Sequence, residues 1–449
     1  MVDIRPFQGL RYAAQEVGSL DAVTCPPYDV ISDALWDELY RRSEYNVVRL
    51  VLGKTSEDDD EFDNRYTRAA GFLRQWRAQG VLRQDTVPAI YAYEQQFTVG
   101  DRRYSRLGFI ASVKLQEFGK GDILPHEQTL SKPKADRLLL LRSTRTNLSP
   151  VFGIFEDSEG VTDRVLREQI ENLTPDTAVD DTGTVNRLWA ITDPAAISTV
   201  RQQMKGAQAL IADGHHRYET SLDYRREVRQ SLGDEDRGQE LPCDFAMMMF
   251  VNMHDPGLVV LPTHRVIYGL DGFDPDDFVR KCARWFTVEQ VDLSVLASAS
   301  DMTPDPFLDS WSRSNRLPAG STVFGLYLPG RLYLLKLEGG PSQVASMLDQ
   351  SRSEAWRSLD VSILHSVVIR HLLGISEADQ VAQSHIKYTR SLHEAVSMVD
   401  SGIYQAALLM NAPTVADVAR VSRSGEKMPQ KSTYFYPKLL TGLVMRPLD

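Results

Sequence analysis

The stretch AQALIADGHHRYET, residues 207–220, decides the fold of this 449-residue chain. Residues 207–212 form a short apolar run, which predicts a buried strand. Gly214 interrupts that run, and the amphipathic residues 215–231 predict a helix directly after it. The sequence therefore predicts a strand-to-helix junction within a protein of mixed α/β (α+β) class.

The junction is suited to an anion, above all a phosphate. Backbone N–H groups in the first turn of a helix have no partner within the helix, and the helix dipole is positive there. Gly214 lets a ligand approach the backbone, and Arg217 offers a planar guanidinium that can hold two phosphate oxygens. The residues expected to bind phosphate are Gly214, His216 and Arg217, and the expected catalytic groups beside them are Asp213 and His215.

Two other interpretations of the junction stay open. His215 and Glu219 are four residues apart and share a helix face, so they could ligate a metal ion. His215 and His216 point about 100° apart on a helix, which is poor geometry for joint ligation of one ion. The junction could also be a plain surface turn with solvated histidines. Phosphate is the interpretation that we favour, and no metal ligand is assigned.

A second polar segment, residues 125–134, is longer and richer in reactive groups than a plain connection needs. His126 and Glu127 could take a proton from a substrate hydroxyl, so both are candidate catalytic residues. Lys132 and Lys134 could neutralise a phosphoryl group, so both are candidate phosphate ligands. The alternative is a capped loop that leads into the helix predicted from residue 135.

Composition limits the possible function classes. The net charge of −11 argues against a general nucleic-acid binder on electrostatic grounds, although it does not forbid a small basic pocket for a nucleotide. Three widely spaced cysteines predict neither a disulfide framework nor a zinc knuckle. No signal peptide or membrane-spanning run is evident, so we expect a cytoplasmic protein without a membrane partner.

The length predicts two domains, and a change of character near residues 269–272 places the boundary between 1–270 and 271–449. Hairpins are predicted at 89–99 with 103–118 and at 322–328 with 331–337. Other predicted strands are 151–155, 187–191, 245–251 and 258–261. Predicted helices are 33–42, 62–79, 135–145, 275–285, 361–373 and 415–422.

Two further segments carry polar groups of interest. Residues 25–30 hold Asp29 on a stiff Pro-Pro turn, as a base, a magnesium ligand or a simple turn residue. Residues 427–438 are dense in aromatic side chains and in donors that suit a phosphate. That second segment could close over a site or pack against the body of the protein.

Six motifs, in order along nearly the whole chain, resemble the uncharacterised family catalogued as domain of unknown function 1015. They are IRPFQGLRY (4–12), PPYDVI (26–31), YNVVRL (45–50), LPHEQTLSKPKADRL (124–138), IADGHHRYET (211–220) and MPQKSTYFYPKLLTGL (428–443). Membership of this family does not by itself imply an activity.

A second resemblance does bear on chemistry. Residues 213–217 are similar to the Gly-x-x-Arg phosphate-binding motif of the ParB and sulfiredoxin superfamily, which implies a ParB/sulfiredoxin-like nucleotide-binding core with an additional α+β lobe. It also implies that Gly214 and Arg217 bind phosphate. The catalytic cysteine of sulfiredoxins is replaced by His215, so that reduction chemistry is not implied. The free-serine kinases of the superfamily, whose motif also begins Asp-Gly-His, resemble the chain more closely.

The sequence thus favours nucleotide-dependent phosphoryl transfer to or from a small hydroxylated metabolite, with serine or phosphoserine as the leading substrate. ATP or ADP with Mg²⁺ is the expected cofactor. One alternative is a nucleotide-sensing or DNA-associated regulator, which would need a basic recognition helix, with residues 415–422 plus Arg423 as the nearest candidate. The other alternative is a phosphatase that needs no nucleotide.

Overall fold

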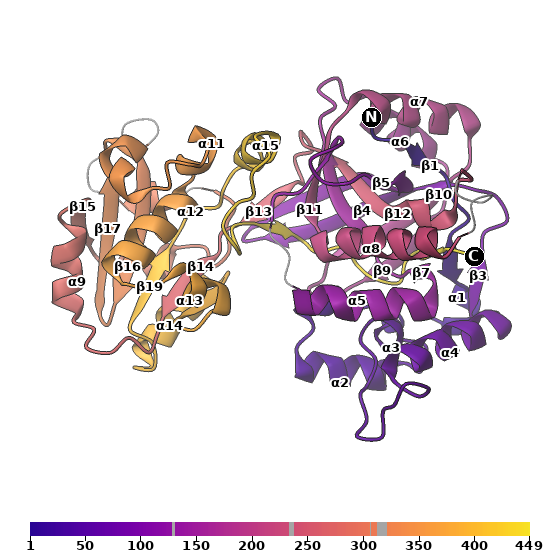
Figure 1. The fold of residues 1–449 in the computed structure, drawn as a ribbon, viewed down its shortest axis with the longest axis horizontal. Helices are drawn as coiled ribbons and strands as arrows, with labels where there is room; N and C mark the ends of the chain where they lie inside the picture. The colour runs from indigo at the N-terminus through magenta and orange to yellow at the C-terminus, as the bar shows by residue number, and fades with distance from the viewer. Residues whose placement is uncertain (128–130, 233–237, 306, 312–320) are drawn as a thin grey trace.

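The chain folds into two lobes of unequal size, joined by a narrow waist, and both termini lie on the larger lobe (Figure 1). The computed structural model describes residues 1–127, 131–232, 238–305, 307–311 and 321–449, without the side chains of residues 131, 132 and 309. Across these residues, no helix has both the length and the apolar character that crossing a membrane would require. The three cysteines are buried and unpaired.

The large lobe is built, within the described residues, on a nine-stranded mixed sheet in the order β6-β11-β8-β12-β5-β4-β10-β9, with β1 paired to β5. The pairs β6–β11 and β8–β12 are parallel, and the others are antiparallel. The strands are β1 (Ile4–Arg5), β4 (Ile90–Val99), β5 (Arg102–Lys114), β6 (Ile123–Leu124), β8 (Val151–Phe155), β9 (Asp176–Val179), β10 (Val185–Ile191), β11 (Ala209–Asp213) and β12 (Phe245–Asn252).

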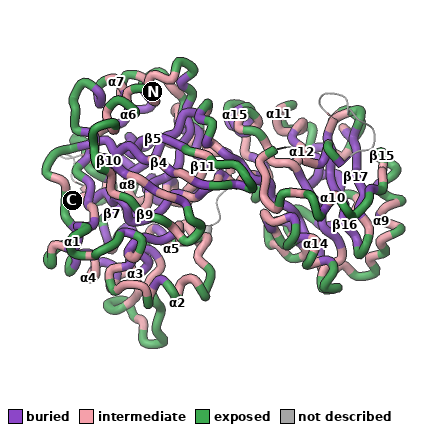
Figure 2. Tube along the Cα trace, turned by 180° about the vertical axis from the view of Figure 1, so that it is seen from behind, coloured by how far each residue is buried: buried purple, intermediate pink, exposed green. Residues whose placement is uncertain are grey.

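Helices and loops bury both faces of this sheet, as the purple strands of Figure 2 show. Successive residues of a strand point to opposite faces. Ile90 of β4 therefore packs in one core with Leu166 and Val200, while its neighbour Tyr91 packs in another core with Trp76. These partners lie on α6 (Val161–Ile170), α7 (Pro194–Gly206) and α4 (Arg65–Ala78). The hairpin predicted from residue 89 is confirmed, and its strands are buried on both sides.

Two long helices, α5 (Ser131–Thr144) and α8 (His215–Ser231), lie side by side on the large lobe (Figure 1). They run parallel, since later residues of α5 contact later residues of α8. Lys134 lies 3.3 Å from Asp223, and Arg142 lies 2.5 Å from Glu227. The predicted bounds of α8 are confirmed. The parallel arrangement brings the starts of both helices to the same end of the lobe.

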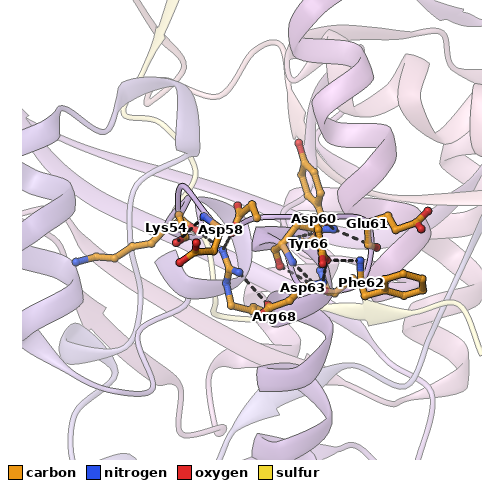
Figure 3. Close-up of polar contacts among 12 residues, drawn as sticks. Lys54, Asp58, Asp60, Glu61, Phe62, Asp63, Tyr66 and Arg68 are labelled. Atoms are coloured by element: carbon orange, nitrogen blue, oxygen red, sulfur yellow. Dashed lines mark hydrogen bonds and ion pairs between the residues drawn. The ribbon is translucent and has the colours of Figure 1, made fainter.

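The sequence predicted that a helix follows the acidic segment from residue 62, but α4 begins at Arg65 because the residues before it form a turn. One carboxylate oxygen of Asp60 accepts the N–H groups of Phe62 and Asp63, each at 2.7 Å (Figure 3). Asn64 then caps α4 by accepting from the backbone of Thr67. Short polar side chains that bind nearby amides favour turns and helix starts over helix interiors, which explains the later start.

Smaller elements complete the large lobe. β2 (Leu10–Tyr12) pairs with β3 (Leu82–Gln84), and β7 (Thr146–Asn147) pairs with β21 (Arg446–Pro447). The short helices are α1 (Ala14–Val17), α2 (Asp33–Arg42) and α3 (Val48–Val51).

The small lobe is built, in the part of the chain that the structure describes, on a six-stranded antiparallel sheet in the order β15-β17-β16-β19-β14-β18. Its strands are β14 (His264–Ile267), β15 (Thr287–Val291), β16 (Thr322–Leu328), β17 (Arg331–Leu337), β18 (Ile386–Thr389) and β19 (Ala406–Leu409). Its helices are α9 (Pro275–Cys282), α10 (Ser294–Ser298), α11 (Glu354–Arg357), α12 (Asp360–Ile363), α13 (Glu377–Ala382), α14 (Leu392–Asp400) and α15 (Val415–Arg423). The predicted hairpin at 322–337 is confirmed.

One predicted helix of this lobe, 361–373, is wound differently from expectation. After α12 the chain continues as a π-helix, Leu364–Leu372. The N–H of Leu373 accordingly reaches the carbonyl of Val368, five residues back, at 3.0 Å.

The chain crosses the waist twice, and the two crossings pair with each other. β13 (Val259–Leu261) leads out of the large lobe and pairs antiparallel with β20 (Tyr434–Tyr436), which leads back. Beyond β20 the chain packs on the large lobe, where Thr441 pairs with Cys25 and β21 with β7. The division into 1–270 and 271–449 stays a prediction, but the sheets place β14 with the small lobe and the final residues with the large one.

Candidate functional site

The predicted junction is where the chain passes from β11 into α8. Gly214, the N-cap of α8, has a φ of +85°, a left-handed conformation that favours glycine. A Cβ on Gly214 would also come within 2.8 Å of the Arg217 guanidinium, which folds back over it. Glycine has no side chain with which to cap the helix, so the first-turn amides depend on other acceptors.

The segment at residues 125–127 lies against this junction, which the sequence alone could not establish. β6 pairs parallel with β11, matching Leu124 to Leu210, so the residues that follow β6 arrive beside the start of α8. The backbone N–H of His126 donates to His215 Nε2 at 3.2 Å, and the two imidazole rings meet edge to face at 4.7 Å. His126 is 1% exposed and His215 4% exposed.

Hydrogen bonds fix the protonation of His126. Its Nδ1 lies 2.6 Å from the Ile211 carbonyl, which can only accept, so Nδ1 carries the proton. Its Nε2 lies 2.7 Å from Thr433 Oγ1 and is therefore the acceptor of that hydroxyl when the ring is neutral. Burial lowers the pKa of His126, and burial together with His126 lowers the pKa of His215. Both rings are thus neutral near pH 7.

Asp213 is the centre of a buried charge cluster. One of its oxygens accepts from the Lys438 ammonium, and the other accepts from Arg217 at 2.7 Å. Burial alone would raise the pKa of Asp213, but the charges of Lys438 and Arg217 outweigh it and hold that pKa well below its ordinary value. The second arm of Arg217 donates to the carbonyl of Pro150. The guanidinium expected to hold phosphate is therefore engaged by protein groups.

Two less buried carboxylates border this cluster. Glu127 has a 36% exposed side chain and lies 3.9 Å from His215 Nδ1. Asp29 is exposed, and its charge acts on Lys438 and on His216. Burial lowers the pKa of His216, while the charges of Glu127, Glu219 and Asp29 act in the opposite direction.

The structure describes the side chain of only one of the two lysines in the 125–134 segment. The side chain of Lys132 lies outside the described residues. Lys134 forms ion pairs with Asp223 at 3.3 Å and with Glu219 at 3.8 Å, further along α8. Lys134 is therefore held about one and a half to two and a half turns along α8 from Gly214.

The alternative interpretations of the junction can be compared with this geometry. A surface turn with solvated histidines does not fit a His215 that is buried. Among the described residues, no group of three or more His, Cys, Asp or Glu side chains converges as a metal site. The basic residues of the helix proposed for DNA are ion-paired, Arg420 with Asp417 and Arg423 with Glu156, each at 2.7 Å.

Two residues at the centre of the site were not among those predicted. Thr433 and Lys438 arrive on the segment that returns from the small lobe, whose Met428 N–H also donates to the His126 carbonyl at 2.8 Å. The Lys438 ammonium lies 4.6 Å from the ring centre of Tyr434. The sequence pointed to these two residues only through the density of donors at 427–438. It did not show that this segment lies against the start of α8.

The chain belongs to the family described as protein of unknown function DUF1015, whose model matches residues 4–362. No curated protein matches the chain.

Solved structures resemble the chain only distantly. A conserved hypothetical protein from Pyrococcus furiosus has a TM-score of 0.31 at 13% identity, over 72% of this chain and 92% of its own. A free serine kinase in complex with AMP has a TM-score of 0.32 at 13% identity, over 72% of this chain and 89% of its own. SbnI from Staphylococcus aureus, truncated at its C-terminus, has a TM-score of 0.31 at 9% identity, over 71% of this chain and 82% of its own. Similarities of this size carry no argument about activity, which must rest on the geometry of the site.

Proposed function

We propose that the protein catalyses nucleotide-dependent phosphoryl transfer to or from a small hydroxylated metabolite, at the junction of β11 and α8. The observation that carries the proposal is the convergence of three distant segments on Gly214. These segments bring His126 and Glu127, the Asp213–Arg217 pair, and Thr433 with Lys438. The similarity of residues 213–217 to the ParB and sulfiredoxin phosphate motif supports a nucleotide-binding core of that kind in the large lobe.

In this proposal the phosphates of ATP or ADP bind at the first turn of α8. The glycine at position 214 allows close approach, and the helix start favours negative charge. Asp213 holds the cationic groups of Arg217 and Lys438 within reach of that turn. A bound phosphate competes with Asp213 for these two cations, and His216 adds a neutral donor beside them.

The acceptor hydroxyl needs a base, and we assign that role to Glu127 or Asp29. Asp213, the base candidate from the sequence, is stabilised as an anion by two cations and is a weak base for that reason. The acceptor oxygen bonds to the terminal phosphorus, the bond from phosphorus to the bridging oxygen breaks, and the proton passes to the carboxylate. The shortened nucleotide is the leaving group. If Glu127 is the base, His215, which lies between His126 and Glu127, orients its carboxylate.

A Mg²⁺ ion that accompanies the nucleotide fits the same border of the site. Magnesium in nucleotide sites is held by one or two carboxylates and by the phosphates themselves. Asp29 and Glu127 are both open enough to hold it, and the carboxylate that does not act as the base would do so. The ion would supply neutralisation of phosphate charge.

Serine, or phosphoserine for the reverse direction, is the leading substrate, because the Asp-Gly-His start of the motif is shared with free-serine kinases. The first test is thermal stability with ATP, ADP, CTP, serine and phosphoserine, each with and without Mg²⁺. A ligand at about a hundred times its dissociation constant stabilises a protein by about 2.7 kcal/mol. We expect a nucleotide to raise the melting temperature of the wild type and of Lys205→Ala, an exposed lysine on α7.

The same nucleotide should stabilise Arg217→Ala much less. Transfer itself is then followed as formation of phosphoserine from serine and nucleotide, and Glu127→Gln and Asp29→Asn identify the base. No stabilisation of the wild type by any nucleotide would contradict the proposal. Release of inorganic phosphate from phosphoserine without nucleotide would indicate the phosphatase alternative, and salt-sensitive retardation of DNA the regulatory one.

A further inference from the structure

A cavity of about 400 Å³ lies in the small lobe, outside the site described above. Its walls come from the end of β18, the π-helix, α11, α13 and the segment 425–430. A volume of this size is within the range of small-molecule sites. The lining residues used below are Arg352, Trp356, His365, Arg370, Tyr388 and Glu426.

The π-helix shapes one wall of the cavity. Because its hydrogen bonds run between residues five apart, side chains five apart lie on the same face. His365 and Arg370 are spaced in this way, and both line the cavity. In an α-helix the same two side chains would point in different directions. Single turns of π-helix occur frequently at functional sites.

Two donor groups in this cavity, Tyr388 Oη and the Arg352 guanidinium, lack close acceptors. Tyr388 Oη is buried and has no hydrogen-bond partner among the described residues. The nearest carboxylates to the Arg352 guanidinium are Asp349 at 3.5 Å and Glu426 at 3.9 Å, which are long contacts for charged hydrogen bonds. The guanidinium lies 5.4 Å from the ring centre of Trp356.

The acceptors of the cavity, by contrast, are engaged by protein groups. Glu426 accepts from the backbone N–H and the hydroxyl of Ser353. Glu377 accepts from Arg370 at 2.6 Å, and the amide oxygen of Gln380 faces His365 Nδ1 at 2.7 Å. His365 in turn accepts from Arg265 through Nε2 at 3.2 Å. A ligand that brings acceptors is therefore matched to this cavity, and one that brings donors is not.

We propose that this cavity binds a small organic anion, whose carboxylate or phosphate oxygens accept from Arg352 and, once the cavity wall adjusts to expose it, from Tyr388 Oη. The site is independent of the phosphoryl transfer proposed above. Its wall continues into the segment that reaches the first site, since Trp356 Nε1 donates to the Lys427 carbonyl at 3.1 Å and the next residue, Met428, donates to His126.

The test measures binding of succinate, citrate and inorganic phosphate by titration calorimetry and thermal shift, at constant ionic strength. Succinamide, which has the shape of succinate without its charge, is the matched neutral ligand. Tyr388→Phe and Arg352→Gln remove the two donors. Arg280→Gln is the control, because Arg280 is 67% exposed on α9 of the same lobe.

We expect at least one of the anions to bind saturably to the wild type and to Arg280→Gln, and succinamide not to bind. Each donor variant should weaken that binding about tenfold or more, since hydrogen bonds to a charged group contribute about 1.5–3 kcal/mol. The stronger of the carboxylate and phosphate ligands identifies the anion. Arg217→Ala should bind the anion like the wild type, which separates this site from the nucleotide site. No saturable binding, or equal binding by the double donor variant, would overturn the proposal.

Discussion

The junction site of the large lobe and the cavity of the small lobe differ in how their charges are balanced. At the junction, the carboxylate of Asp213 already accepts from Lys438 and Arg217. In the cavity, Tyr388 Oη has no partner among the described residues, and the Arg352 guanidinium forms long ion pairs with Asp349 at 3.5 Å and with Glu426 at 3.9 Å. A ligand at the junction must exchange places with a protein group, whereas a ligand in the cavity completes an unfinished set of contacts.

This difference separates two ways of building an anion site. At the junction, Asp213 keeps Lys438 and Arg217 in place when no ligand is bound. An anion that binds there must compete with Asp213 for these two cations. An unbalanced cavity avoids that competition, but it leaves a buried hydroxyl without a hydrogen bond, which costs about 1–3 kcal/mol. The predictions below test this comparison, from the largest expected effect to the smallest.

Removing Lys438 should have the largest effect on stability. Lys438→Met leaves Asp213 with one cation in a buried site, and breaking such a pair costs about 3 kcal/mol or more. The change is measured as the free energy of unfolding in urea. The double variant Lys438→Met with Asp213→Asn should recover part of the loss.

Lys336→Met is the matched control for this prediction, because Lys336 pairs with Glu289 in the small lobe and is 3% exposed. We expect it to lower stability while leaving stabilisation by nucleotide intact. Equal loss of the nucleotide effect in both variants would show that Lys438 acts only through stability.

Acid should destabilise the small lobe through its buried histidines. Burial and the charge of Arg265 lower the pKa of His365 and of His264 to about 3. The unfolded chain takes up these protons near pH 6.5 and the folded chain does not. Stability is therefore full above pH 6.5 and falls as the pH drops toward 3, by about 2 kcal/mol per histidine at pH 5.

The measurement is the free energy of unfolding of the wild type and His365→Gln between pH 7 and pH 4. The variant should lose less stability over this range. Asp213 follows the same rule in a more acidic window, since its lowered pKa keeps its contribution present above the ordinary aspartate range and that contribution is lost only in stronger acid. A profile for His365→Gln that is parallel to that of the wild type would contradict the assignment.

Thr433→Val should have a moderate effect, because it removes a hydroxyl that has a partner. The change leaves the buried Nε2 of His126 without a donor and should cost about 1 kcal/mol. Phosphoryl transfer should slow as well, and Thr433→Ser should restore both. Urea unfolding and initial rates at saturating nucleotide measure the two effects.

Tyr388→Phe should cause the smallest loss of stability, because it removes a hydroxyl that has no partner among the described residues. Its free energy of unfolding should equal that of the wild type or exceed it by up to about 3 kcal/mol, since an unpaired buried hydroxyl is removed. The pair Thr433→Val and Tyr388→Phe thus compares the same loss of one hydroxyl in the balanced and the unbalanced region. A loss for Tyr388→Phe as large as that for Thr433→Val would remove the distinction.

The sequence predicted local features of the fold well, because they depend on nearby residues. The helix after Gly214 begins and ends where its periodicity indicates. The helix expected from residue 62 begins at Arg65, because Asp60 and Asn64 bind the amides of that segment. Such competition between side chain and backbone is hard to read from periodicity.

The site was predictable only in part, because its assembly depends on contacts between distant segments. His126 meets His215 through the parallel pairing of β6 with β11, which no local pattern encodes. Thr433 and Lys438 reach the site only after the chain has crossed the waist twice. The role of Asp213 was also open from sequence, since its charge state depends on those same distant cations.

The return of the chain across the waist has a consequence for protein synthesis. The ribosome makes the strands of the large sheet first, then the whole small lobe, and only afterwards the residues 433–447 that complete the first lobe. Domains that emerge early often fold during translation. Here the large lobe has to wait for its last strand and for Lys438, so a nascent chain cannot complete the candidate site before the small lobe has been made.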